Sequence, residues 1–348
     1  MKVLLITGAD GWLGRAIVKK LLESDKFFKN FNYLVLHSLS KKKFLNEDSI
    51  KTFKNNGINL LFINGALEDN SLSKNFLKIS KENVFSELNI IYTSSIIHCK
   101  KVKDFFEINY VGLKNFYNNL DKSILKKFTY ISSNSPFGFN KKGILFDEFS
   151  KYKPLGGYGH SKQLAEEFLL SIQNEKVITI IRAPWFHGND MPDRQINFLR
   201  KASKGNFPII GFGKNKRSLV NTLDLAVASL NVTFSNRKNN IYWISELNSY
   251  SMHFILKIIQ KSYGKRVKKS FKNKIKFLML PIGFSSICCV IDLFLQKLGI
   301  YNMYLHVLGE LGQNIECSSK KYRDEFPEHQ WHEFPYSIDD ELNEAFKK

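Results

Sequence analysis

Six short runs of large apolar residues constrain the fold of this chain more than any other feature. Each run is rich in Val, Ile, Leu and Phe and lacks the polar alternation of a strand with one face in water. The runs occupy residues 2–7, 33–37, 59–63, 95–99, 127–132 and 177–182. Helical patterns lie between them, for example at residues 12–24, 104–120 and 158–173. Alternating strands and helices predict an α/β fold built on a doubly wound parallel (Rossmann) sheet.

The pattern changes after Arg182, where Pro and Gly recur and the helical stretches become shorter. We therefore predict a dinucleotide-binding domain over residues 1–182 and a smaller, mostly helical substrate-binding lobe over residues 183–348. Part of the second segment, near residues 215–245, is expected to return to the sheet. A chain of 348 residues is long enough for two domains that share a cleft.

The formal net charge of +20 has two interpretations. A basic surface can attract nucleic acid or anionic membranes. However, the lysines are spread over the whole chain, and no dense basic run alternates with aromatic residues as in a nucleic-acid surface. We therefore expect no specific nucleic-acid partner.

The four cysteines, at positions 99, 288, 289 and 317, show neither CxxC spacing nor histidines at metal-ligand intervals. We therefore expect no disulfide bonds and no metal site. Without a signal-peptide pattern at its amino terminus, the chain is expected in the cytoplasm.

Residues 277–300 form the most apolar segment of the chain. Pro281 interrupts it and Asp292 lies inside it, so its uncharged stretch is shorter than the ~20 residues that a spanning helix needs. We expect a buried helix or a lid rather than a membrane span. A peripheral membrane contact stays open as the alternative.

The first predicted strand runs directly into three glycines. Gly8 would permit a tight turn, Gly11 would let the backbone approach a pyrophosphate, and Gly14 would let the following helix pack against the strand. The amino terminus of that helix would then present N–H groups to the phosphates. The spacing is GxxGxxG, which predicts a dinucleotide-binding turn in this setting.

A second constellation carries chemistry. Tyr158 and Lys162 lie one helical turn apart in YGHSK. A tyrosine acts as a base near pH 7 only if its pKa falls by roughly three units, about 4 kcal/mol, and a nearby ammonium can provide this. The strand before them delivers Ser132 and Ser133 to the carboxyl end of the sheet, and Asn109 can face the same crevice.

Together, TGADGWLG, the NYVG that contains Asn109, ISSNSPFG and YGHSK resemble the short-chain dehydrogenase/reductase superfamily. The similarity is to its extended branch, the NAD-dependent epimerase/dehydratase family, over roughly residues 1–230. The resemblance implies that Tyr158 is the catalytic acid/base and that Lys162 binds the nicotinamide ribose. It also implies that Ser133 holds the substrate oxygen and that Asn109 belongs to a proton relay. Hydride would move between nicotinamide and a hydroxyl or keto carbon of a nucleotide-linked sugar.

The resemblance implies NAD(P) as cofactor. It further implies cofactor contacts from Gly8, Gly11, Trp12, Leu13, Gly14, His37, Ser38, Leu67, His98, Tyr158, Lys162 and Ala183. The second strand ends in His37 and Ser38, without the carboxylate that usually bonds the adenosine ribose of NAD. Lys41–Lys43 follow closely, which favours NADP over NAD.

Substrate contacts are implied for Ser133, Ser135, Arg194, Asn197 and Arg217. Arg217 would pair with the nucleotide diphosphate, because a guanidinium bonds phosphate oxygens bidentately. Arg182 is expected to be structural.

Residues 134–135 are Asn-Ser, where the family's 4,6-dehydratases carry an Asp-Glu pair. Dehydration is therefore disfavoured, and a 4-epimerase or a keto-sugar reductase remains. Two alternatives stay open: an enzyme like a 3β-hydroxysteroid dehydrogenase, acting on a lipidic alcohol, and a non-catalytic NAD(P)-binding regulator. The resemblance also implies a homodimer formed through helices 104–120 and 158–173.

Overall fold

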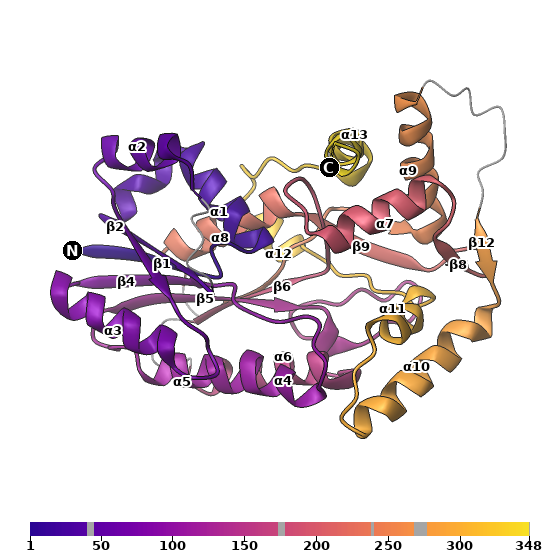
Figure 1. Cartoon of the computed structure of the whole chain (residues 1–348), viewed down its shortest axis with the longest axis horizontal. Coiled ribbons are helices and arrows are strands. Elements are labelled where there is room, and N and C mark those ends of the chain that lie inside the picture. The colour runs from indigo at the N-terminus through magenta and orange to yellow at the C-terminus, as the bar shows by residue number, and fades with distance from the viewer. Residues whose placement is uncertain (40–44, 173–177, 238–239, 268–276, 348) are drawn as a thin grey trace.

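The computed structural model describes residues 1–39, 45–172, 178–237, 240–267 and 277–347. Its centre is a seven-stranded sheet in the order β3-β2-β1-β4-β5-β6-β10, and every pairing within it is parallel (Figure 1). The strands are β1 (Lys2–Thr7), β2 (Tyr33–Ser38), β3 (Asn59–Asn64), β4 (Glu87–Tyr92), β5 (Leu125–Ser133), β6 (Ile178–Ala183) and β10 (Asn240–Trp243).

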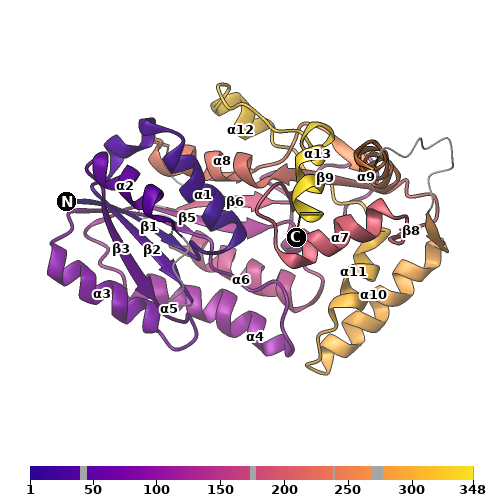
Figure 2. The same ribbon diagram turned by 45° about the horizontal axis from the view of Figure 1, so that its top comes forward.

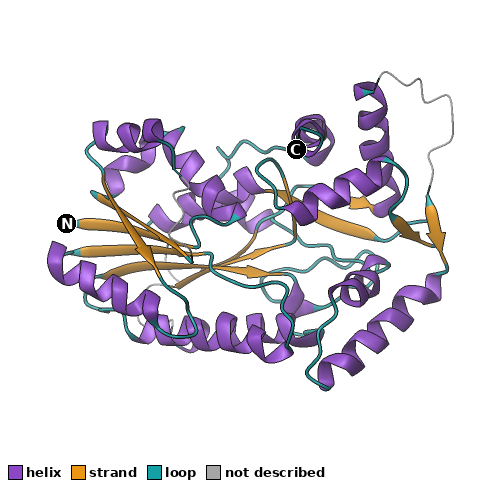
Figure 3. Cartoon of the chain, in the orientation of Figure 1, coloured by secondary structure: helices purple, strands orange, loops and turns teal. Residues whose placement is uncertain are grey.

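Strand β1 shows why the apolar runs lack polar alternation. Val3 and Leu5 pack into the hydrophobic cluster on one face of the sheet, and Leu4 and Ile6 pack into the cluster on the other face. All four side chains are fully buried. Both faces of the sheet are therefore covered, as Figure 3 shows, and the predicted doubly wound fold is confirmed.

Helices form a layer on each face of the sheet (Figure 1). The helices of one layer are α1 (Trp12–Leu22), α2 (Glu47–Asn55) and α8 (Thr222–Phe234). Those of the other are α3 (Ser71–Asn83), α4 (Val102–Phe106), α5 (Leu113–Asn118) and α6 (Gly156–Ser171). A π-helical turn, Glu107–Gly112, joins α4 to α5.

One predicted strand was wrong. Residues 95–99 lie in the loop after β4, and the strand is Glu87–Tyr92 instead. Residues 90–97 contain two apolar groups, which are separated by Thr-Ser-Ser. Ile90 and Ile91, before these residues, are fully buried in the sheet, whereas Ile97, after them, is exposed. Apolar content alone did not distinguish a strand from the loop that leaves it.

The chain builds one edge of the sheet from β1 through β2 to β3, and then returns to place β4 on the other side of β1. This reversal of strand order opens a crevice at the carboxyl ends of β1 and β4. Ligands of doubly wound sheets bind at such a point, so the fold fixes where the functional site is to be sought.

After Ala183 the chain leaves the sheet and forms a second lobe (Figure 2). A three-stranded sheet orders as β11-β9-β7, and β8 pairs with β12. The strands are β7 (Trp185–His187), β8 (Pro208–Ile210), β9 (Lys216–Asn221), β11 (Ser249–Ser251) and β12 (Leu278–Leu280). The helices are α7 (Asp193–Ser203), α9 (Met252–Arg266), α10 (Ile282–Lys297), α11 (Met303–Leu311) and α13 (Phe334–Ala345).

Three elements of the later chain return to the first lobe. Helix α8 packs against α1, β10 adds the outermost strand beside β6, and α12 (Lys320–Glu325) packs against β10. The division of the chain into two domains between residues 182 and 183 therefore stays a prediction, because α8 and β10 follow that boundary in sequence and lie beside the first segment in space.

The apolar segment 277–300 forms β12 and α10. The expectation of a buried helix was wrong, because α10 buries mainly polar residues and exposes its apolar face. Among the described residues, no helix is both long enough and apolar enough to cross a membrane.

Candidate functional site

The turn between β1 and α1 brings a helix amino terminus to the crevice. Gly8 adopts a φ of 63°, which favours glycine, and its carbonyl accepts from the Gly11 N–H at 2.9 Å. A Cβ at Gly14 would lie 2.2 Å from the Gly8 carbonyl oxygen. Only glycine at position 14 lets α1 begin this close to the strand end. The geometry fits the cradle of a pyrophosphate.

His37, at the end of β2, is tied into this turn. Its Nδ1 accepts from the Gly8 N–H at 3.2 Å, so Nε2 carries the proton and donates to the Gly65 carbonyl at 2.8 Å. Burial lowers the pKa of His37, which keeps the ring neutral. Both ring nitrogens are therefore used within the protein. Ser38 is buried next to it, and Lys41–Lys43 lie outside the described residues.

Four other residues expected at the cofactor are fixed in the scaffold. Leu13 is in the core, and the Trp12 indole N–H donates to the Asn189 carbonyl at 2.8 Å. Leu67 is buried against Gly112, where a Cβ added to the glycine would lie 2.7 Å from the Cβ of Leu67. Ala183 pairs with Ser133 in the ladder between β5 and β6.

Asn109 lies in the π-helical turn and holds the loop after β4. Its Nδ2 donates to the Ile96 carbonyl at 2.9 Å, and its Oδ1 accepts from the Ile96 N–H at 2.9 Å and from the Ser95 hydroxyl at 3.1 Å. Nδ2 also lies 3.2 Å from the Ser161 hydroxyl, which donates to the Tyr158 carbonyl. A widened helical turn at a functional site is a recurrent feature. Asn109 thus joins the loop to the helix that carries Tyr158.

Tyr158 lies near the start of α6. Burial raises the pKa of its phenol to about 12, while the hydroxyl groups of Ser133 and Ser95 and the charge of Arg194 oppose this rise. The phenol is therefore protonated near neutral pH. Ser133 and Tyr158, which lie 25 residues apart in sequence, act on one another in space.

Lys162 is deeply buried below Tyr158 on α6. Its Nζ donates to the Ile131 carbonyl at 2.9 Å and lies 4.6 Å from the centre of the Tyr130 ring. Burial lowers the pKa of Lys162 to about 7, and the Glu166 carboxylate opposes this effect. Lysine was expected to lower the pKa of the tyrosine, yet the groups that do so here are Ser133, Arg194 and Ser95.

Ser133 ends β5, and Ser135 begins the short 3-10 turn Ser135–Phe137. The Ser133 hydroxyl accepts from the Ser135 N–H at 3.2 Å and lies 3.2 Å from the Ser135 hydroxyl. The two hydroxyl groups expected at the substrate oxygen therefore lie together.

Arg194 and Asn197 lie three residues apart on α7. Arg194 donates to the Nε2 of His98 at 2.6 Å, so the His98 Nδ1 carries the proton that faces the Tyr301 hydroxyl at 2.8 Å. Burial and the charges of Arg194 and His306 lower the pKa of His98 to about 4, so its ring is neutral. Asn197 is exposed.

Arg217, on β9, is buried and incompletely paired. Its Nη2 donates to the Glu310 carbonyl at 2.6 Å, while its Nε has no hydrogen-bond partner in the described part of the chain. Among the described residues, no carboxylate lies within ion-pair distance of Arg217. Burial lowers the pKa of Arg217, and the charge of Glu310 opposes this shift. Such a guanidinium is suited to an anionic ligand.

Sequence reasoning missed one wall of this site, formed by α10, α11 and the residues between them. Tyr301 contacts His98, and Gln296 accepts from the Gly157 N–H at 2.7 Å, one residue before Tyr158. His306 pairs with Asp292 at 2.9 Å and lies 3.5 Å from Glu310. These residues are more than a hundred positions from Tyr158 and belong to no motif, so no local pattern signalled them.

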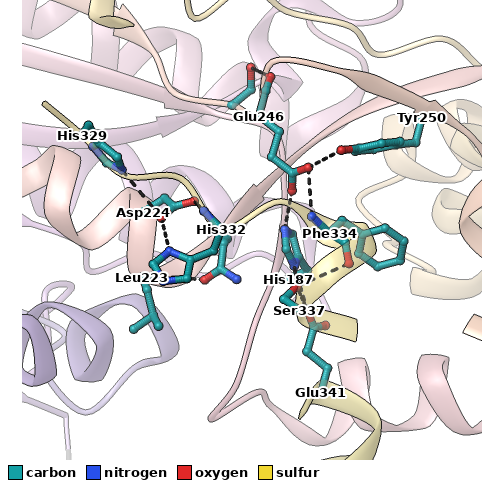
Figure 4. Close-up of polar contacts among 12 residues, drawn as sticks. His187, Leu223, Asp224, Glu246, Tyr250, His329, His332, Phe334, Ser337 and Glu341 are labelled. Carbon is teal, nitrogen blue, oxygen red and sulfur yellow. Dashed lines mark hydrogen bonds and ion pairs between the residues drawn. The ribbon is translucent and has the colours of Figure 1, made fainter. Parts of the chain in front are cut away.

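Two buried clusters of histidines and carboxylates, also not expected, fasten the carboxyl-terminal residues to the molecule (Figure 4). His187 lies between Glu246 at 2.6 Å and Glu341 of α13 at 2.8 Å. Burial alone would lower the pKa of His187, but the two carboxylates raise it to about 10. In the second cluster, Asp224 accepts from the backbone and the ring of His332 at 2.8 and 2.6 Å.

Comparison with known proteins adds independent information. Residues 4–245 match the model of the NAD dependent epimerase/dehydratase family. "Uncharacterized protein y4nL" from Sinorhizobium fredii is 31% identical, over 92% of this chain and 88% of its own length. "Putative UDP-glucose 4-epimerase" from Methanocaldococcus jannaschii is 27% identical, over 76% of this chain and 83% of its own length. The crystal structure of dTDP-glucose 4,6-dehydratase from Bacillus anthracis with NAD has a TM-score of 0.71 at 17% identity and covers 100% of this chain and 97% of that one.

Proposed function

This chain belongs to the NAD-dependent epimerase/dehydratase family, and from this premise we propose that it moves a hydride between a nicotinamide cofactor and a carbon of a nucleotide-linked sugar. The reaction we propose first is 4-epimerisation, and reduction of a keto-sugar is the second candidate. The observation that carries the proposal is the convergence of Ser133, Tyr158 and Asn109, where Asn109 also holds the loop that lies against Gly8.

Each residue has a role in this proposal. Tyr158 exchanges a proton with the sugar hydroxyl, and Ser133 hydrogen-bonds the same oxygen. Lys162, held by the Ile131 carbonyl, is available to the nicotinamide ribose. A bound nicotinamide supplies the hydride acceptor or donor. Asn109 positions Ser95, whose hydroxyl lowers the pKa of the phenol.

Arg217 supports a nucleotide diphosphate as the anionic part of the substrate. Its buried Nε has no partner among the residues that the structure describes, and a phosphate oxygen can accept from it. The M. jannaschii relative, named for UDP-glucose, is consistent with this class of substrate. Dehydration is not proposed, because Asn134 and Ser135 offer no carboxylate to act as the additional acid and base.

The cofactor form is left as NAD(P). The preference for NADP depended on Lys41–Lys43, which lie outside the described residues, and His37 bonds to the protein through both ring nitrogens. Gentle denaturation of the purified protein, followed by mass spectrometry of the released molecules, identifies the cofactor. Stoichiometric NAD supports epimerisation, because an epimerase regenerates its cofactor in each turnover. Reversible binding of NADPH to an empty protein supports a reductase.

The Tyr158→Phe variant tests the mechanism. We expect the interconversion of UDP-glucose and UDP-galactose, or the reduction of a keto-sugar, to fall by about a thousandfold or more. Binding of the dinucleotide should change little, since the phenol is aimed at the substrate. Tyr152→Phe is the matched control, because Tyr152 bonds Glu166 in the scaffold. Turnover of Tyr158→Phe at the wild-type rate would overturn the mechanism.

A further inference from the structure

Helix α10 has the reverse of the polarity of an ordinary surface helix. Its buried residues are Ser285, Cys288, Asp292 and Gln296, which recur at helical spacing on one face. Polar atoms of three of them are paired inside the protein. Ser285 donates to the Gly309 carbonyl at 2.6 Å, and the amide of Gln296 donates to Asp292 at 2.8 Å. The polar face of α10 is therefore the face that packs on the protein.

The opposite face of α10 is apolar and exposed. We call it the apolar face, and its residues are Ile282, Ile287, Val290, Ile291, Phe294 and Leu298. Val290 is 67% exposed and Phe294 is 61% exposed. Leu278, Met279, Ile300 and Tyr304 on the adjoining elements are also exposed. A contiguous apolar surface of this kind marks an interaction site in most soluble proteins.

Positive charge borders the carboxyl-terminal end of the apolar face. Lys297 lies at the end of α10, and Lys101 forms a bridge with Ile300 just beyond it, next to the exposed Lys100. The one acidic residue of α10, Asp292, is buried and so does not offset these charges at the surface. Two copies of this face would bring like charges together, whereas an anionic surface would complement them.

We propose that the apolar face of α10 docks onto an anionic lipid membrane, with the helix lying in the plane of the headgroups. An exposed apolar face bordered by cations is the pattern of an interfacial helix. In both Figure 1 and Figure 2, α10 lies at the outer edge of the molecule, where a flat surface can reach it. The helix lies on the bilayer and does not cross it, in agreement with the absence of a spanning helix among the described residues.

Docking would place the membrane next to the candidate site. The face of α10 turned away from the lipid contacts Gly157 through Gln296, directly before Tyr158, and reaches His306 through Asp292. A substrate held at the membrane could therefore enter beside the helix that forms one wall of the site. The docking itself does not depend on the proposed reaction.

Co-sedimentation with lipid vesicles tests the proposal. We expect the full-length wild-type protein to bind vesicles of 70% phosphatidylcholine and 30% phosphatidylglycerol, and to bind pure phosphatidylcholine at least tenfold more weakly. The double variant Val290→Glu/Phe294→Glu should lose binding to the anionic vesicles by at least tenfold. Both positions are exposed, so folding should be preserved, and circular dichroism checks this.

The matched control is Val84→Glu/Phe149→Glu. It replaces the same two residue types at positions that are 76% and 91% exposed, and it changes the net charge equally. This control should bind anionic vesicles like the wild type. The proposal is overturned if the wild type does not bind, or if the two double variants lose binding equally. It is also overturned if light scattering shows that Val290→Glu/Phe294→Glu only dissociates a dimer that has no affinity for vesicles, because the occupant is then a second copy.

Discussion

Arg182 and Arg217 are both buried, yet the protein surrounds them in different ways. Arg182, on β6, donates from Nε and Nη2 to the Glu166 carboxylate at 3.0 and 2.8 Å, and its guanidinium lies 4.3 Å from the centre of the Phe137 ring. Arg217, by contrast, donates one hydrogen bond, to the backbone carbonyl of Glu310. Among the described residues it has no carboxylate partner, and its Nε is unpaired.

The difference separates scaffold from site. Around Glu166, the Ser132 and Tyr152 hydroxyl groups donate to the same carboxylate that receives Arg182, so the cluster closes on itself. A closed cluster adds rigidity and has little capacity left for a ligand. A buried cation without an ionic partner costs stability, and such a cost persists where a ligand pairs with the group. Substitutions in the two regions separate scaffold from site, and Glu166→Gln has the largest expected effect.

Glu166→Gln should give the largest loss of stability. Removing the carboxylate charge leaves Arg182 buried without a counter-ion, which costs about 3–5 kcal/mol of unfolding free energy. Urea denaturation measures it. The double variant Glu166→Met/Arg182→Met is the control and should be more stable than Glu166→Gln, because both charges are removed. A loss below about 1 kcal/mol in Glu166→Gln would remove the distinction between the two arginines.

Glu341→Gln tests the buried cluster around His187, and its effect on stability depends on pH. The pKa of His187 is raised to about 10, so its contribution to stability is complete below the unfolded value near 6.5 and is lost as the pH rises through 10. We expect Glu341→Gln to cost about 3 kcal/mol at pH 6.

The difference between Glu341→Gln and the wild type should shrink toward pH 10. Comparing the two proteins cancels the opposite pH dependence of Lys162, whose pKa is lowered. Denaturation at several pH values gives the curve. A difference that stays constant from pH 6 to pH 10 would mean that His187 carries no charge in this cluster.

Arg217→Met should affect ligand binding far more than stability. We expect affinity for UDP to fall by about tenfold to a hundredfold, because a charged hydrogen bond contributes about 1.5–3 kcal/mol. The unfolding free energy should change by less than about 1 kcal/mol, since the substitution removes a buried cation that lacks an ionic partner. Calorimetry with UDP and urea denaturation measure the two quantities. Arg237→Met, at a half-exposed arginine, is the control for the change of charge.

Ser135→Ala should have the smallest effect. Its hydroxyl lies 3.2 Å from that of Ser133, so its loss should lower turnover by less than about tenfold, or roughly 1 kcal/mol. Ser133→Ala should lower turnover by more, because Ser133 also acts on Tyr158. Steady-state kinetics of both variants decides the order, and a larger loss in Ser135→Ala would reverse their proposed roles.

Much of the first segment could be read from the sequence, because its signals are local. Five of the six predicted strands lie within a few residues of the observed strands, and the glycine turn lies between β1 and α1 as expected. The error at residues 95–99 arose because a strand and the loop that follows it were equally apolar. YGHSK was assigned to a helix correctly, since helical spacing is visible in the chain itself.

The sequence by itself determined the class of the fold, the family and the residue types available for chemistry, because these depend on short-range patterns and motifs. Only the tertiary structure decided which atoms are paired. It tied His37 into the glycine turn, closed Arg182 onto Glu166 and left the Nε of Arg217 unpaired. It also turned the apolar face of α10 outward and its polar face toward Tyr158. Pairing and exposure depend on contacts between residues far apart in the chain, which no local pattern records.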